Sequence, residues 1–212
     1  MVVTLLGSTG LVGGHCLRLL LKDSRITRIL LPVRKTPVHK NEDPRLCYTA
    51  IDFGRLTEYA ELFQSDALIC CLGTTIKKAG SRQAFEEADV RLPLAAAALA
   101  KREGVRICAL VSAMGAHRGS PVFYNRCKGL LEEGMALLGF DSLTIARPSL
   151  LLGERQERRP AEALMQRVSL PLLPLIPAFW RPVYAETVAE RLVRSVLDAQ
   201  PGLHVLYNRQ LI

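Results

Sequence analysis

The chain has 212 residues, 49% of them hydrophobic and 23% charged, and its formal net charge is +8. This length is enough for one domain that buries most of its apolar surface, and the composition excludes a disordered or fibrous protein. The positive charge suits either a nucleic acid or a small anionic ligand. The densest charged run, residues 153–160, mixes both signs and contains no aromatic side chain for bases to stack on, so we expect no nucleic-acid partner.

The remaining composition bears on membranes, metals and location. The best candidate for a membrane span, residues 169–180, is short and contains three prolines, so we expect no span. No secretory signal is visible at the start of the chain. The six cysteines lack the spacing of metal ligands, and four of them fall in apolar segments where a thiol packs as a small hydrophobe. We therefore predict no metal site and a reducing, cytoplasmic location.

Apolar runs alternate with helix-like stretches almost throughout the chain. The predicted strands are residues 2–6, 28–33, 46–52, 67–72, 106–112, 143–147 and 204–207. They are continuous apolar runs, which is typical of parallel strands that are covered by helices on both faces. The sequence therefore predicts a single α/β domain over residues 1–212, with a doubly wound, mainly parallel sheet of about seven strands.

Two helices follow from the apolar spacing and from their end signals. One covers residues 10–23, directly after the first strand. The other covers residues 81–102 and opens on Ser81, which can cap a helix. Pro93 is expected to kink the second helix, because proline cannot donate a backbone hydrogen bond.

The regular alternation ends near the C-terminus, where several prolines and the lone tryptophan occur within residues 155–183. In a doubly wound fold such an irregular insertion often covers the ligand crevice, so we predict a small substrate-covering segment at about 150–183. The alternative is a surface connection, or a contact through residues 170–180 with a protein partner or a second copy of the chain.

Three glycines, Gly7, Gly10 and Gly13, form a G-x-x-G-x-x-G pattern between the first strand and the first helix. Any tight turn uses glycine. The position between a strand and an amphipathic helix favours a dinucleotide site, because the backbone can approach a diphosphate closely and the free N–H groups of the helix N-terminus face the anion. The predicted diphosphate-binding residues are Gly7, Ser8, Thr9, Gly10, Leu11 and Val12.

The second predicted strand is followed by Arg34 and Lys35 instead of an acidic residue. An acid at this place accepts the ribose 2′-hydroxyl of NAD, whereas an arginine accommodates the 2′-phosphate of NADP. This pair favours NADP, although solvated basic residues are common at the end of a strand.

Two further strand ends offer cofactor contacts, because ligands of open α/β sheets bind at the carboxyl ends of the strands. Asp52, next to Phe53, ends the third strand and could meet the adenine amino group. The fourth strand runs into the sequence CCLGTT, where Gly73 would let the chain pass close to the cofactor. The predicted contacts in that sequence are Leu72, Gly73, Thr74 and Thr75.

A candidate catalytic group lies within residues 110–129. Ser112 ends the fifth strand, and Tyr124 and Lys128 are four residues apart at the start of a helix, so both face the same side. A lysine ammonium near a tyrosine favours the phenolate and lowers the tyrosine pKa, so the phenol can exchange a proton with a carbonyl or alcohol oxygen. Ser112 would hold the same oxygen. The Y-x-x-x-K spacing is common by itself and gains meaning only beside the serine and the glycine loop.

These motifs together resemble the atypical short-chain dehydrogenases/reductases. The sequences CCLGTT, KAG, YNRCKG and ARPSLLLGERQERRPAE are most similar to the Tat-interacting-protein (CC3-like) oxidoreductases and their bacterial relatives. The resemblance implies a Rossmann-type fold that binds NADP(H), with Ser112, Tyr124 and Lys128 as catalytic residues. It also implies that Lys128 touches the nicotinamide ribose and that Pro148 and Leu150 pass near the carboxamide.

The sequence thus predicts an NADP(H)-dependent oxidoreductase that reduces a carbonyl, or oxidises an alcohol, on a small molecule. The alternative is an NADPH-binding regulatory protein with little or no turnover, because the resemblance extends to proteins with regulatory partners.

Overall fold

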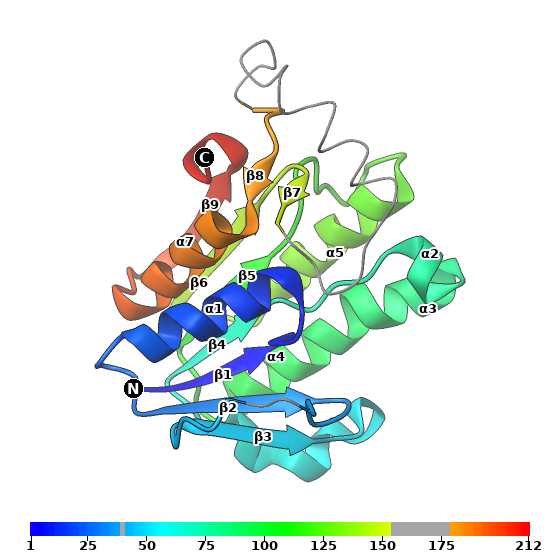
Figure 1. Cartoon of the computed structure of the whole chain (residues 1–212). Helices are drawn as coiled ribbons and strands as arrows, with labels where there is room; N and C mark the ends of the chain where they lie inside the picture. The colour runs from blue at the N-terminus through cyan, green and yellow to red at the C-terminus, as the bar shows by residue number, and fades with distance from the viewer. Residues whose placement is uncertain (39–40, 154–178) are drawn as a thin grey trace.

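The core of the protein is a parallel sheet of seven strands (Figure 1). The structure is a computed structural model and describes residues 1–38, 41–153 and 179–212. The strands run in the order β3-β2-β1-β4-β5-β6-β9, and every neighbouring pair is parallel. Their bounds are β1 Val2–Leu6, β2 Arg28–Val33, β3 Leu46–Ala50, β4 Ala67–Cys70, β5 Ile107–Val111, β6 Ser142–Arg147 and β9 Gly202–Tyr207. The predicted fold class is confirmed.

Alternate residues of the strands supply two separate apolar cores. In β4, Ala67 and Ile69 belong to one cluster of buried side chains, whereas Leu68 and Cys70 belong to the other. A strand that buries both faces must be apolar at every position, which is why these strands are continuous apolar runs.

Helices cover both faces of the sheet (Figure 1). On one face lie α1 and α7, and on the other lie η1, α4 and α5. Their bounds are α1 Leu11–Lys22, η1 Phe53–Phe63, α4 Leu92–Arg102, α5 Phe123–Leu137 and α7 Ala185–Leu197. The short elements are α2 Ile76–Ala79, α3 Arg82–Glu86, η2 Glu87–Arg91, η4 Asn208–Gln210, and the two-stranded pair β7 Leu151–Leu152 and β8 Val183–Tyr184.

The helix predicted over residues 81–102 is in fact three consecutive segments: α3, the π-helical turn η2, and α4. Ser81 caps the first segment, since its side chain accepts a hydrogen bond from the amide of Ala84. Pro93 explains the wider turn η2, because proline has no N–H to donate to the carbonyl of Asp89 one turn earlier. Instead the amide of Leu92 bonds five residues back to Glu87. This turn contains the fully buried Asp89, and π turns frequently mark functional sites.

The prediction for the third strand was two residues too long. β3 ends at Ala50, and Asp52 instead caps η1 by accepting a hydrogen bond from the amide of Gly54 at 2.9 Å. Aspartate competes well for backbone amides, so it ends a strand and begins a helix.

Four cysteines, Cys16, Cys70, Cys108 and Cys127, are buried and not disulfide-bonded, as predicted for packing residues. Burial raises the pKa of Cys70 to about 11, which keeps its thiol protonated. Within the described part of the chain, no helix is both long and apolar enough to cross a membrane.

Candidate functional site

The strand order reverses between β1 and β4, where connections run to opposite sides of the sheet. Open α/β sheets bind their ligands at the carboxyl edge next to such a point. The glycine loop follows β1 at this edge, and residues 71–75 follow β4 beside it. The topology therefore places two predicted cofactor segments next to each other.

The glycine loop is built so tightly that side chains would not fit. Gly7 has φ of 78°, and a Cβ on it would lie 2.6 Å from the carbonyl oxygen of Cys71. A Cβ on Gly13 would lie 2.0 Å from the carbonyl oxygen of Gly7. The absence of a Cβ on Gly13 therefore allows α1 to pack against the turn that precedes it. In related loops the glycine at this position commonly allows the helix to pack against the sheet.

The start of α1 has the chemistry of an anion site. Its first residue follows Gly10, no side chain caps its free N–H groups, and no acidic residue lies in its first turn. The hydroxyl of Ser8 is buried and has no hydrogen-bond partner among the described residues. A buried hydroxyl without a partner is costly, and a diphosphate oxygen would satisfy it. The loop therefore fits a dinucleotide.

Arg34 and Lys35 follow β2, which is the neighbour of β1, and both are exposed. Among the described residues neither forms an ion pair. Asp52 lies one strand further out, after β3, where one carboxylate oxygen already holds η1. The two cations are thus available to an anion at the edge of the glycine loop.

A buried ion pair joins the loop after β4 to the candidate catalytic helix. The ammonium of Lys128 lies 2.7 Å from one oxygen of Asp89, and the other oxygen accepts the amide of Thr74 at 2.7 Å. Burial by itself would lower the pKa of Lys128, but Asp89 and then Tyr124 outweigh it, so the pKa is raised and the ammonium stays charged. One carboxylate therefore fixes two segments at once.

Tyr124 and Lys128 lie one turn apart at the start of α5. The Lys128 nitrogen is 6.0 Å from the centre of the Tyr124 ring, and the ring of Phe85 packs on Tyr124 with centroids 5.7 Å apart. The phenol is thus placed by packing from α3 and lies within the field of the ammonium.

Ser112 follows β5 and is almost fully buried. Its backbone amide donates to the carbonyl of Ala146 on β6 at 2.8 Å, and its hydroxyl donates to the carboxylate of Glu132 on α5. Arg147 donates to both oxygens of Glu132, with Nε at 3.0 and 3.1 Å. Sequence reasoning missed Glu132, although it continues the every-fourth-residue series of Tyr124 and Lys128.

The segment containing Pro148 and Leu150 is held by residues that the sequence did not single out. The side chain of Asn208 accepts the amide of Ser149 at 2.7 Å and donates to the carbonyl of Arg181 at 2.8 Å. The carbonyl of Pro148 accepts the amide of Met114 at 2.8 Å. These contacts tie the loop after β6 to the loop after β5.

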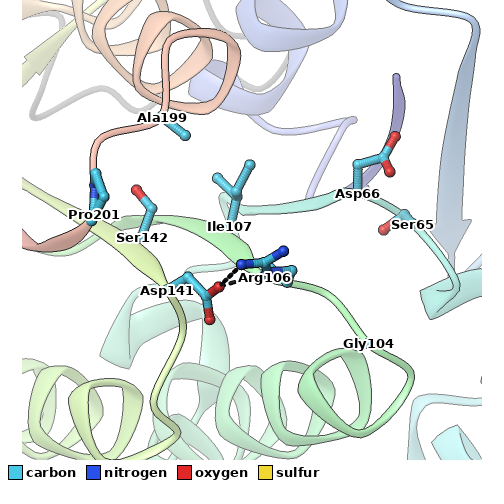
Figure 2. A pocket seen from close by; sticks show the side chains of 9 residues that line it. All are labelled: Ser65, Asp66, Gly104, Arg106, Ile107, Asp141, Ser142, Ala199 and Pro201. Carbon is cyan, nitrogen blue, oxygen red and sulfur yellow. Dashed lines mark hydrogen bonds and ion pairs between the residues drawn. The ribbon is translucent and has the colours of Figure 1, made fainter.

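A surface hollow of about 550 Å³ lies at the opposite, amino edge of the sheet (Figure 2). Its central feature is the ion pair of Arg106 and Asp141, whose nitrogen and oxygen are 2.5 Å apart at the closest. Both side chains are largely exposed, so this pair is screened by water. None of the predicted site residues lines this hollow.

Most of the predicted substrate-covering segment, residues 154–178, lies outside the described residues. The same holds for most of the predicted partner contact at 170–180. Its last two residues, Phe179 and Trp180, are 55% and 58% exposed, and their rings pack with centroids 5.6 Å apart. Both predictions remain predictions.

The fold is that of a Rossmann-type α/β protein, and the relatives place the chain in the atypical short-chain dehydrogenase/reductase superfamily. The chain is 33% identical to the rat protein HTATIP2 over 217 residues, which cover 99% of this chain and 87% of the relative. It is 36% identical to the mitochondrial protein FMP52 of Candida albicans over 158 residues, covering 72% of this chain and 68% of the relative. The chain belongs to the family of HTATIP2 and FMP52. No family model matches it.

Solved structures share the fold at low identity. The enzyme WbmH of Bordetella bronchiseptica in complex with NAD+ superposes with a TM-score of 0.76 at 16% identity, covering 97% of this chain and 75% of that one. UDP-glucose 4-epimerase of Thermotoga maritima with UDP-glucose gives 0.73 at 13%, covering 98% and 77%. At these identities the likeness concerns the fold alone.

The predicted cytoplasmic location is wrong on the evidence of the relatives. The FMP52 proteins of Candida albicans, Emericella nidulans and Aspergillus niger are all named mitochondrial. Unpaired cysteines indicate a reducing compartment without distinguishing among compartments, so they could not decide this point.

Proposed function

We propose that this protein is an NADP(H)-dependent oxidoreductase that interconverts a small carbonyl compound and its alcohol. The proposal depends most on the carboxylate of Asp89. It binds the ammonium of Lys128, a candidate catalytic residue, and it accepts a hydrogen bond from the amide of Thr74, a predicted cofactor contact. Burying the Lys128 ammonium costs desolvation free energy, which the ion pair must offset. A residue that served only to fill space would not require this charge.

The diphosphate of the cofactor would lie on the N-terminus of α1, with the hydroxyl of Ser8 as a further donor. Arg34 and Lys35 would hold the 2′-phosphate, which supports NADP over NAD. When bound, the cofactor would supply or accept the hydride.

Tyr124 would carry the proton in this reaction. Its phenol would donate a proton to the carbonyl oxygen during reduction and remove one from the alcohol during oxidation. Lys128, held charged by Asp89, would stabilise the phenolate that reduction leaves behind.

The cofactor assignment is tested by titrating the protein with NADPH and NADH while following the fluorescence of the reduced nicotinamide. We expect NADPH to bind more tightly, and Arg34→Ala to weaken NADPH binding about tenfold without affecting NADH. Arg102→Ala, at the amino edge of the sheet, is the matched control and should change neither. Equal affinities for the two cofactors would refute the NADP preference.

The reaction is tested by a screen of aldehydes and ketones with NADPH. Tyr124→Phe should lower turnover on any accepted substrate by about 10²–10⁴-fold and leave NADPH affinity unchanged. Tyr48→Phe, on β3 and away from α5, is the control. Turnover that survives in Tyr124→Phe would rule out the phenol as the proton carrier.

A second candidate function is an NADPH-binding protein that acts through a partner. The exposed rings of Phe179 and Trp180, which pack against each other with an interplanar angle of 53°, favour it, since aromatic side chains are enriched at contact surfaces. Trp180 is the only tryptophan, so its fluorescence reports on this surface directly. NADPH binding without turnover in the screen, together with a change in Trp180 fluorescence on adding NADPH, would favour the second candidate.

A further inference from the structure

The buried carboxylate of Asp89 bears on how tightly Tyr124 and Lys128 hold their protons. The side chains of Lys128 and Asp89 are both buried, and the ammonium nitrogen lies 2.7 Å from the carboxylate oxygen. The same nitrogen lies 6.0 Å from the centre of the Tyr124 ring. The ammonium is therefore in contact with an anion while it acts on the phenol, and water has little access to screen these charges.

The other titratable groups close to Lys128 add no net charge. Cys70 of β4 acts on Lys128, but burial raises the pKa of its thiol to about 11, so the thiol is neutral at neutral pH. Glu132 lies one turn beyond Lys128 and is paired with Arg147, whose Nε is 3.0 and 3.1 Å from its two oxygens. The charges of this second pair offset each other. Asp89 therefore supplies the anion that contacts the ammonium.

The charges that lie further from Lys128 are screened or offset one another. Such side chains on the segments that flank Tyr124 include Arg82 and Glu86 of α3, Arg126 of α5 and His117 of the loop after β5. Arg82 and His117 are exposed, so water and salt screen them. Glu86 and Arg126 shift the pKa of the neighbouring Cys127 in opposite directions. None of these residues replaces the buried charge of Asp89.

We infer that Asp89 is a positioning residue that acts through Lys128 and makes the pair of Tyr124 and Lys128 keep both of its protons at neutral pH. When the pair loses one proton, it becomes either a phenolate beside an ammonium or a phenol beside a neutral amine. Either product is one charge more negative than the fully protonated pair, so a buried carboxylate in contact with the pair disfavours both. The sequence alone suggested an ammonium that acts on Tyr124 unopposed.

The consequence for catalysis, which rests on the proposed function, is a different pH dependence for the two directions of the reaction. Reduction starts from the fully protonated pair, because Tyr124 must give a proton to the carbonyl oxygen. Oxidation starts from the pair that has already lost one proton, because a base must take the hydroxyl proton of the alcohol. Asp89 thus keeps the pair in the state that reduces carbonyls near neutral pH and confines alcohol oxidation to alkaline pH.

A titration followed by ¹³C NMR tests the protonation of the wild type without cofactor or substrate. The protein is labelled at Cζ of tyrosine and at Cε of lysine, and the variants Tyr124→Phe and Lys128→Met identify the two signals. Free tyrosine and lysine side chains lose their protons near pH 10, so we expect both midpoints to lie above about pH 9. A midpoint below that value for either signal would overturn the inference.

The variant Asp89→Asn removes the charge at nearly constant size. We expect the pair to lose its first proton about one to two pH units lower than in the wild type, as measured by whichever signal moves first. Asp89→Glu keeps an anion and should restore most of the difference. Glu87→Gln, which removes an exposed acid on the same turn, is the matched control and should leave the midpoint unchanged. An Asp89→Asn midpoint equal to that of the wild type would contradict the inference, and if this variant does not fold, the wild-type titration decides.

The pH profile of turnover is a second readout. For the alcohol product of any carbonyl compound that the screen accepts, kcat/KM at saturating NADP+ should rise with pH up to the midpoint of the pair in that complex. Asp89→Asn should move this rise to lower pH, whereas a merely structural role of Asp89 would lower the rate without moving it. Failure of the wild type to bind NADPH would instead count against the proposed function, and the NMR midpoints would still decide the role of Asp89.

Discussion

Lys128 and Asp89 form an ion pair of 2.7 Å in which the two side chains are only 4% and 1% exposed. The lysine comes from α5 and the aspartate from the π turn η2. Because the second oxygen of Asp89 holds the amide of Thr74, this pair connects the helix that carries Tyr124 with the loop that follows β4.

Removing the charge of Asp89 alone should be strongly destabilising. In Asp89→Asn the ammonium of Lys128 stays buried without its counter-charge, which costs about 3–5 kcal/mol. The double variant Asp89→Asn/Lys128→Met replaces both charges and should recover most of this loss while staying inactive. Urea unfolding measures both values. A double variant no more stable than Asp89→Asn would show that the ion pair is not what the single variant breaks.

The variant Asp89→Asn should also change how the free energy of unfolding depends on pH. In the wild type the pKa of Lys128 is raised above its ordinary 10.5, so the contribution of the pair is complete below that pH and is lost only as the pH rises through the raised pKa. In Asp89→Asn burial acts without its main opponent and lowers the pKa below 10.5. The stability of the variant should therefore increase with pH between about 7 and 10.

The free energy of unfolding, measured over that pH range, checks this sign. The double variant Asp89→Asn/Lys128→Met has no ammonium at this position and serves as the baseline. A slope in Asp89→Asn that equals the slope of the double variant would mean that Lys128 is not desolvated in the single variant.

Two adjacent glycines of α1 should respond in opposite ways to alanine. The added Cβ at Gly13 would meet the carbonyl oxygen of Gly7 at 2.0 Å, whereas at Gly14 the nearest atom is 3.7 Å away. Gly13→Ala should thus displace the loop and weaken NADPH binding at least tenfold. Gly14→Ala should bind normally and gain up to about 1 kcal/mol in stability from helix propensity. Equal effects of the two variants on binding would contradict the proposed position of the diphosphate.

The variant Ser8→Ala should weaken NADPH binding without lowering the stability of the protein. The buried hydroxyl has no partner among the described residues, so deleting it should leave stability unchanged or raise it by about 1 kcal/mol. The same deletion should weaken NADPH binding, because a diphosphate oxygen would lose a donor. Thermal unfolding with and without NADPH measures both effects. A loss of stability without cofactor would indicate that Ser8 has a structural role.

Local sequence patterns were sufficient for the fold. The inner strands of the main sheet, β1, β2, β4, β5 and β6, are mostly apolar and are buried at most positions. This pattern can be recognised without knowledge of distant residues. The glycines between β1 and α1 could also be recognised from the sequence, because the tight turn that requires them involves only neighbouring residues. The pair β7 and β8 was missed because two residues carry no periodicity.

The same difference between local and distant relationships applies to the site residues. Tyr124 and Lys128 could be related from sequence, because a helix brings residues four apart onto one face. Asp89 could not be paired with Lys128 from the sequence, because a π turn and the packing of α5 are needed to bring the two side chains together. Glu132 was not noticed at all, because its partners Ser112 and Arg147 come from two different strand ends.

The sequence by itself determined the α/β class, the parallel strands, the glycine loop and the spacing of Tyr124 and Lys128, all of which depend on neighbours along the chain. Only the tertiary structure decided which carboxylate serves which candidate: Asp89 holds Lys128, and Glu132 holds Ser112. The physical reason is that a buried charge must find its partner across the fold. Here the partners are separated by 39 and 20 residues, and the sheet topology alone brings them together.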